Sequence, residues 1–160
     1  MRTLIAAVGK IRPGAEKELA ERYCQRARQM GRNIGFSGPD MVEIDEARAR
    51  QEGQRRQMEA ARLLAAAGDS GPKIAFDEHG KTLTTRQFAK RLGGWRDEGA
   101  SSCALLIGGP DGHGGEVLDK ADLVIALGAM TWPHMLARAM IAEQLYRAMT
   151  ILAGHPYHRD

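Results

Sequence analysis

Two almost wholly apolar runs, each followed directly by glycine, constrain the fold of this chain most strongly. They cover residues 102–107 and 123–127, and neither contains a charged residue. A strand that is apolar on both faces is typical of a parallel sheet with helices on both sides. Less uniformly apolar runs at 3–8, 41–44 and 73–77 alternate with longer amphipathic segments. This alternation predicts an α/β fold with a mainly parallel sheet.

The amphipathic segments between these runs are predicted to be helices. Thr84 or Thr85 is a suitable N-cap for one of them, and Pro133 suits the first turn of the last. No repeat, linker or low-complexity tract divides the sequence, so one domain over residues 1–160 is expected. The expected helices cover residues 14–30, 47–67, 84–96, 116–120 and 133–153.

Composition excludes several classes of protein. No apolar stretch approaches the roughly 20 residues of a membrane helix, and the run after Met1 is too short for a signal peptide. A cytoplasmic protein with no membrane association is therefore expected. Cys24 and Cys103 are far apart, which predicts reduced structural thiols. Arginine outnumbers lysine among the 23 basic residues, which allows a nucleic-acid partner but also fits codon bias.

The glycines after the two apolar runs predict a ligand site. Ligands of open α/β sheets bind at the carboxyl ends of strands, and small residues let a backbone approach a ligand closely. The loop at 108–115 matches no dinucleotide fingerprint, and neither Gly-Lys pair of the chain has the spacing of a Walker A loop. Together, the loops at 108–115 and 127–132 predict an adenosine-sized pocket. A flexible connection at 108–115 is the alternative.

The last predicted helix and the tail hold a second group of candidates. The helix is apolar almost all round, which predicts burial on several sides and favours a homodimer. Glu143 and Arg147 are four residues apart. This spacing predicts either a surface ion pair or a pair that is part of a site. The tail at 155–159 contains two histidines, a tyrosine and an arginine. Two histidines without a third ligand do not predict a metal site.

Three segments together resemble the RlmH family of SPOUT methyltransferases. They are residues 105–112 (LLIGGPDG), 142–148 (AEQLYRA) and the tail 155–159 (HPYHR). The resemblance covers the whole chain and is strongest from about residue 103 onward. It implies a doubly wound sheet with a C-terminal trefoil knot over about 103–160, a rare topology that periodicity does not reveal. It also implies an obligate homodimer, S-adenosyl-L-methionine (SAM) as methyl donor, and no metal.

The resemblance further implies that the substrate is N3 of a pseudouridine in 23S rRNA of the assembled ribosome. Its cofactor contacts correspond to Phe76, Gly108, Leu127, Gly128, Ala129, Met130, Thr131 and Trp132. Its catalytic group corresponds to Tyr157, His158 and Arg159, with Glu143 and Arg147 holding the tail or substrate.

Each tail residue has an expected role. We expect His158 to accept the N3 proton, Arg159 to stabilise the imidate oxygens, and Tyr157 to stack on the base or hydrogen-bond to it. The sequence departs from the family pattern at 113–115, which is richer in glycine, and at Gly154.

Other functions are consistent with the same residues. One is a SPOUT methyltransferase that acts on tRNA or on another rRNA position. Another is a non-enzymatic, ribosome-associated RNA-binding factor, which needs no pocket between the loops at 108 and 128. A small flavodoxin-like binding protein fits less well, because the chain has no phosphate-binding loop near its start.

Overall fold

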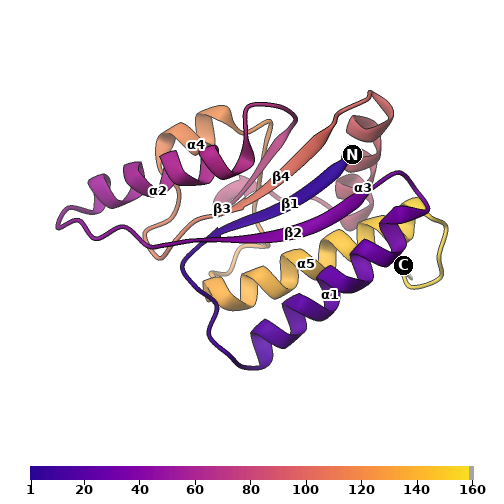
Figure 1. Ribbon diagram of the computed structural model, residues 1–160, viewed down its shortest axis with the longest axis horizontal. Coiled ribbons are helices and arrows are strands. Elements are labelled where there is room, and N and C mark those ends of the chain that lie inside the picture. The colour runs from indigo at the N-terminus through magenta and orange to yellow at the C-terminus, as the bar shows by residue number, and fades with distance from the viewer. Residues whose placement is uncertain (159–160) are drawn as a thin grey trace.

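Five parallel strands form the sheet that the apolar runs predict, in the order β2-β1-β4-β3-β5 (Figure 1). The computed structural model describes residues 1–158. The strands are β1 (Arg2–Val8), β2 (Ser37–Ile44), β3 (Lys73–Lys81), β4 (Ser102–Ile107) and β5 (Leu123–Ile125). The helices are α1 (Ala15–Arg32), α2 (Glu52–Ala67), α3 (Thr85–Asp97), α4 (Gly115–Lys120) and α5 (His134–Leu152).

Helices cover both faces of the sheet, which confirms the doubly wound α/β class. β4 lies at its centre and alternates between two cores. Cys103, Leu105 and Ile107 pack with α1, α3 and α5, whereas Ala104 and Leu106 pack with α2 and α4. All five side chains are at most 4% exposed. The trefoil knot over about 103–160 stays a prediction, because strand order alone does not define threading.

The segment before α2 differs from the predicted helix at 47–67. The helix begins only at Glu52. The backbone N–H of Ala47 donates instead to Oε1 of Glu59, at 2.8 Å, and this carboxylate is itself buried. The first N–H groups of a helix have no acceptor within it, so this contact satisfies the N–H of Ala47 outside the helix, and residues 45–50 stay irregular.

Three strands also differ by two residues or more from the predicted bounds. β2 begins at Ser37 and includes Pro39, which an edge strand tolerates. β5 ends at Ile125, two residues early. β3 pairs with β4 as far as Phe76, and its ladder to β5 resumes only at Lys81. Residues 77–80 therefore bend away at the end of the ladder.

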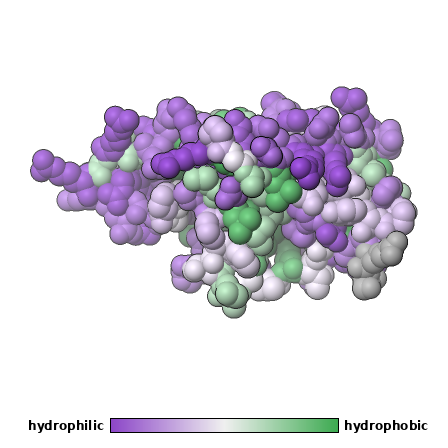
Figure 2. All heavy atoms as spheres, turned by 90° about the horizontal axis from the view of Figure 1, so that it is seen from below, coloured by the Kyte–Doolittle hydropathy of each residue, from purple (hydrophilic) through white to green (hydrophobic). Residues whose placement is uncertain are grey.

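Contacts within one chain explain why α5 is apolar almost all round. The helix lies between α1, α3 and the sheet, and Ile141, Leu145 and Met149 are fully buried there. The apolar pattern therefore gives no argument for a subunit interface. On the side of α1 and α5, hydrophobic residues do gather at the centre of the surface, with hydrophilic residues around them (Figure 2). Within the described chain, no helix is long and apolar enough to cross a membrane.

Candidate functional site

A cavity of about 380 Å³ opens where β3, β4 and β5 end, a volume in the range of small-molecule sites. We call it the strand-end cavity. The loops after β4 and β5 and the start of α5 form most of its wall. Its lining consists of Phe76, Asp77, Glu78, Ile107, Gly108, Gly109, Pro110, Asp111, Gly112, His113, Ile125, Leu127, Gly128, Met130, Thr131, Trp132, His134, Ala137 and Ile141.

The structure gathers the predicted cofactor contacts around this one cavity, with the exception of Ala129. Phe76 comes from β3, Gly108 from the loop after β4, and the others from the stretch 127–132. Met130 and Trp132 are 72% and 42% exposed, so apolar side chains stand at the rim. Gly128 adopts a φ of 119°, which favours glycine. Their part in cofactor binding stays a prediction.

The glycine-rich loop after β4 is packed rather than a flexible connection. A Cβ on Gly108 would lie 2.9 Å from the carbonyl carbon of Gly112, so the turn closes tightly only with glycine there. Within this loop, Asp111 accepts from Nε of Arg55 in α2 at 2.6 Å. This hydrogen bond lowers the pKa of Asp111, which keeps the carboxylate charged.

His113 holds the inner side of the same loop, a contact that the sequence analysis missed. The ring is 6% exposed, and Nε2 lies 3.2 Å from the carbonyl oxygen of Phe76. A carbonyl only accepts, so Nε2 carries the proton. Burial lowers the pKa of His113, which makes the ring neutral at pH 7. The loop is thereby tied to the end of β3. The only indication of this contact in the sequence is a histidine among glycines.

The sequence analysis also did not identify the acidic side chains in the wall of the strand-end cavity. Asp77, Glu78 and Asp111 line the cavity, whereas its described lining includes neither lysine nor arginine. Such a wall repels the phosphates of a nucleotide and favours a ligand with positive charge. Asp77 directly follows the third apolar run, so the rule that ligands bind at strand ends applied to it as well. The described residues contain no group of three or more metal-ligating side chains.

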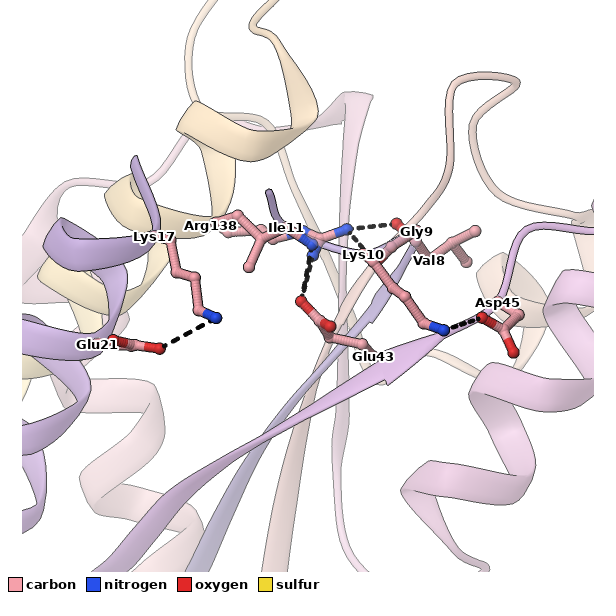
Figure 3. Close-up of polar contacts among 9 residues, drawn as sticks. All are labelled: Val8, Gly9, Lys10, Ile11, Lys17, Glu21, Glu43, Asp45 and Arg138. Atoms are coloured by element: carbon pink, nitrogen blue, oxygen red, sulfur yellow. Dashed lines mark hydrogen bonds and ion pairs between the residues drawn. The ribbon is translucent and has the colours of Figure 1, made fainter. Parts of the chain in front are cut away.

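Arg138 anchors the start of α5 beside the cavity (Figure 3). Its side chain is fully buried, and Nη2 donates to the carbonyl oxygens of Val8 and, at 2.8 Å, of Gly9. Nη1 lies 3.4 Å from Oε1 of Glu43, which also accepts from the backbone N–H of Ile11 at 2.8 Å. The helix turn that carries Ala137 and Ile141 into the cavity is thus held to the end of β1.

The predicted catalytic residues form a second group, which we call the tail cluster: Glu143, Arg147 and Tyr157. Oε1 of Glu143 accepts from Nε of Arg147 at 2.8 Å and from the Tyr157 hydroxyl at 3.2 Å. The guanidinium of Arg147 lies 4.8 Å from the centre of the Tyr157 ring. Burial and the neighbouring groups raise the pKa of Tyr157, so the phenol stays protonated and donates. His158 follows, half-buried, and Arg159 lies outside the described residues.

The tail cluster and the strand-end cavity lie on different faces of α5. Glu143, Arg147 and Tyr157 are absent from the described lining of the cavity, whereas Ala137 and Ile141 are part of it. Two residues at 100° each turn the helix by about 200°, so Ile141 and Glu143 leave α5 in nearly opposite directions. Within one chain, the structure does not bring the predicted catalytic residues to the predicted cofactor contacts.

Comparison with known proteins gives matches over the whole chain. The family described as "Predicted SPOUT methyltransferase" matches residues 1–158. A protein from Nitrobacter winogradskyi named Ribosomal RNA large subunit methyltransferase H is 50% identical over 159 residues, 99% of each chain. Its namesake from Methylocella silvestris is 48% identical over 160 residues and 100% of both chains. The solved structure of a probable methylase family protein from Haemophilus influenzae Rd KW20 matches with a TM-score of 0.51 and 11% sequence identity. The match covers 99% of this chain and 70% of that protein, which indicates a shared fold.

Proposed function

The chain belongs to the SPOUT methyltransferase family, and from this premise we propose that it transfers a methyl group from SAM to N3 of a pseudouridine in 23S rRNA. The observation that carries the proposal is identity of about half over the full length with proteins named Ribosomal RNA large subunit methyltransferase H. The assembled ribosome is the proposed substrate particle, which implies a cytoplasmic enzyme.

The strand-end cavity fits SAM as the methyl donor. Its volume of about 380 Å³ suits an adenosine-sized ligand, and Gly108 and Gly128 leave backbone groups accessible. The apolar side chains of Met130 and Trp132 at the rim are suited to cover an adenine ring. The acidic wall suits a cofactor with positive charges. Bound there, SAM supplies an electrophilic methyl group on a sulfonium sulfur.

The tail cluster is suited to bind the pseudouridine. N3 loses its proton and then uses the freed electron pair to bond the methyl carbon, while the carbon–sulfur pair stays on sulfur. Tyr157 is protonated and donates its one O–H to Glu143, so its ring serves as a stacking surface and its hydroxyl is not the base. His158 remains the proposed proton acceptor, and Arg159 the proposed partner of the imidate oxygens.

Two copies of the chain complete the proposed active site. The tail cluster and the strand-end cavity lie on different faces of α5, so a single chain does not present its own tail to its own cofactor. In a homodimer, the tail of one copy reaches the cavity of the other. The hydrophobic area on the α1 and α5 side offers a surface for this association (Figure 2).

Methyl transfer to purified ribosomes tests the reaction. Ribosomes with and without large-subunit pseudouridines are incubated with labelled SAM, and the modified nucleotide is mapped by mass. We expect label at N3 of one pseudouridine, lost when that pseudouridine is absent. Label on tRNA or at another rRNA position supports the runner-up SPOUT activity. Failure of the protein to bind SAM in calorimetry contradicts the enzyme assignment and favours a non-enzymatic RNA-binding factor.

Subunit mixing tests the shared active site. Gly108→Val spoils the cavity, and Tyr157→Ala spoils the tail cluster. Coexpressed with different tags, the two inactive chains form mixed dimers with one intact composite site. Random assortment then restores about a quarter of the wild-type activity. Activity no higher than that of either variant alone means that each site is built from one chain.

A further inference from the structure

Two carboxylates in the wall of the strand-end cavity take no part in the proton transfer and methyl transfer proposed above. Asp77 and Glu78 follow Phe76 directly, where β3 leaves its ladder with β4. The third carboxylate of the wall, Asp111, is already balanced by Arg55 at 2.6 Å. The described lining includes no lysine or arginine to balance the other two. The excess negative charge of the cavity therefore comes from this strand end.

The local fold holds Asp77 in place. Its side chain is 13% exposed, and Oδ1 accepts from the backbone N–H of His79 at 2.9 Å. The ring of His79 lies 3.1 Å from the same oxygen but is 84% exposed, so water screens any charge on it. Glu78 is exposed beside it. Asp77 is thus the partly buried, oriented charge of the pair, and Glu78 adds a weaker, solvated one.

Building on SAM as the proposed methyl donor, we propose that Asp77 and Glu78 make the cavity selective for the charge on the cofactor sulfur. SAM and its product S-adenosylhomocysteine share the adenosine, amino and carboxylate groups. They differ by one methyl group and one positive charge. A fixed negative wall attracts the sulfonium and gains nothing from the neutral thioether. Asp77 is the main determinant, because its carboxylate is less hydrated than that of Glu78.

This selectivity has a consequence for turnover. The protein can bind the donor tightly without binding the product equally tightly, because the attraction ends when the methyl group leaves. Product release limits the turnover of many enzymes, so a wall that holds only the charged form assists the step after the chemistry. For one charge at roughly 6 Å in a partly hydrated site, the expected preference is about tenfold.

Calorimetric binding to the purified full-length protein tests the proposal. The ligands are SAM, S-adenosylhomocysteine and sinefungin, which carries an ammonium group in place of the sulfonium. Asp77→Asn keeps an oxygen for the His79 N–H and removes only the charge. We expect it to weaken SAM and sinefungin about tenfold and S-adenosylhomocysteine less than about twofold at about pH 8, where ordinary histidines are neutral. Glu78→Gln should act in the same direction, by about twofold to threefold.

The control variant is Asp119→Asn, which removes one exposed charge on α4, away from the cavity lining. It should leave the three affinities unchanged. An equal loss of SAM and S-adenosylhomocysteine affinity in Asp77→Asn, or no loss of either, overturns the proposal. If Asp77→Asn fails to fold, an unchanged affinity ratio in the exposed variant Glu78→Gln overturns it instead. Absence of SAM binding to the wild-type protein overturns the proposed function itself, a distinct result.

Discussion

Replacing Arg138 with methionine tests whether hydrogen bonding by a buried arginine, rather than apolar packing alone, fixes α5 to the end of β1. The guanidinium is fully buried, donates to the carbonyl oxygens of Val8 and Gly9, and lies 3.4 Å from Oε1 of Glu43 (Figure 3). Methionine retains the apolar stem of the side chain but no donor. Both carbonyl oxygens then lose the donor that Arg138 supplies.

The magnitude follows from two opposing effects. Hydrogen bonds to a charged group contribute about 1.5–3 kcal/mol each, so losing two costs about 3–6 kcal/mol. Against this, burial of the cation is itself unfavourable by several kcal/mol, as the lowered pKa of Arg138 indicates. We expect the free energy of unfolding of Arg138→Met to fall by about 2 kcal/mol. Arg138→Lys keeps the charge without the planar fork and should recover part of this loss.

Urea denaturation followed by circular dichroism, at a fixed protein concentration, measures the change. SAM affinity measured on the same samples should fall as well, because Ala137 and Ile141 lie on the anchored turn. Arg22→Met, at an exposed position of α1, is the matched control and should change stability by less than about 0.5 kcal/mol. Stability of Arg138→Met equal to or above that of the wild type would refute the reasoning, since the buried cation would then be a net cost.

Three further predictions concern local features of the fold. Because the pKa of His113 is lowered in the folded state, the unfolded chain binds this proton more readily below about pH 6.5, and the protein loses stability as the pH is lowered. His113→Gln should flatten this pH dependence between about pH 7 and 5 in denaturant titrations. Thr84→Ala removes the acceptor of the Gln87 N–H and half of the capping box of α3, which should cost about 1 kcal/mol in thermal melts, with Thr84→Ser as control. Burial raises the pKa of Cys24 to about 11 and of Cys103 to about 12, so both thiols should resist iodoacetamide until urea unfolds the chain.

The parts of the fold that sequence reasoning predicted well are those in which burial decides the conformation. The run at 102–107 coincides with β4, because a strand covered on both faces must be apolar at every position. Errors fall where a single tertiary contact decides. Nothing in the sequence near Ala47 indicates that a carboxylate twelve positions later will take its N–H. The predicted start of this helix at Ala47 was therefore five residues early.

The two parts of the candidate site differ in the same way. Parallel strands end at one edge of a sheet, so the loops after residues 107 and 127 had to meet there, and the same rule covers the overlooked Asp77. The spacing of Glu143 and Arg147 predicted their contact, which the structure contains. This spacing could not predict which face of α5 turns toward the cavity, because the packing of α5 against α1 and α3 sets that rotation.

Helix geometry then limits what one chain can do. Once Ile141 lines the cavity, a side chain two positions later points about 200° away, whatever its rotamer. Tyr157 is bound to Glu143 on that far side, so moving the tail to the cavity of its own chain would break the cluster that orients it. In the proposed homodimer, the tail cluster of the second copy would keep the contacts among Glu143, Arg147 and Tyr157. The direction of side chains along α5 therefore favours a shared active site, which subunit mixing tests.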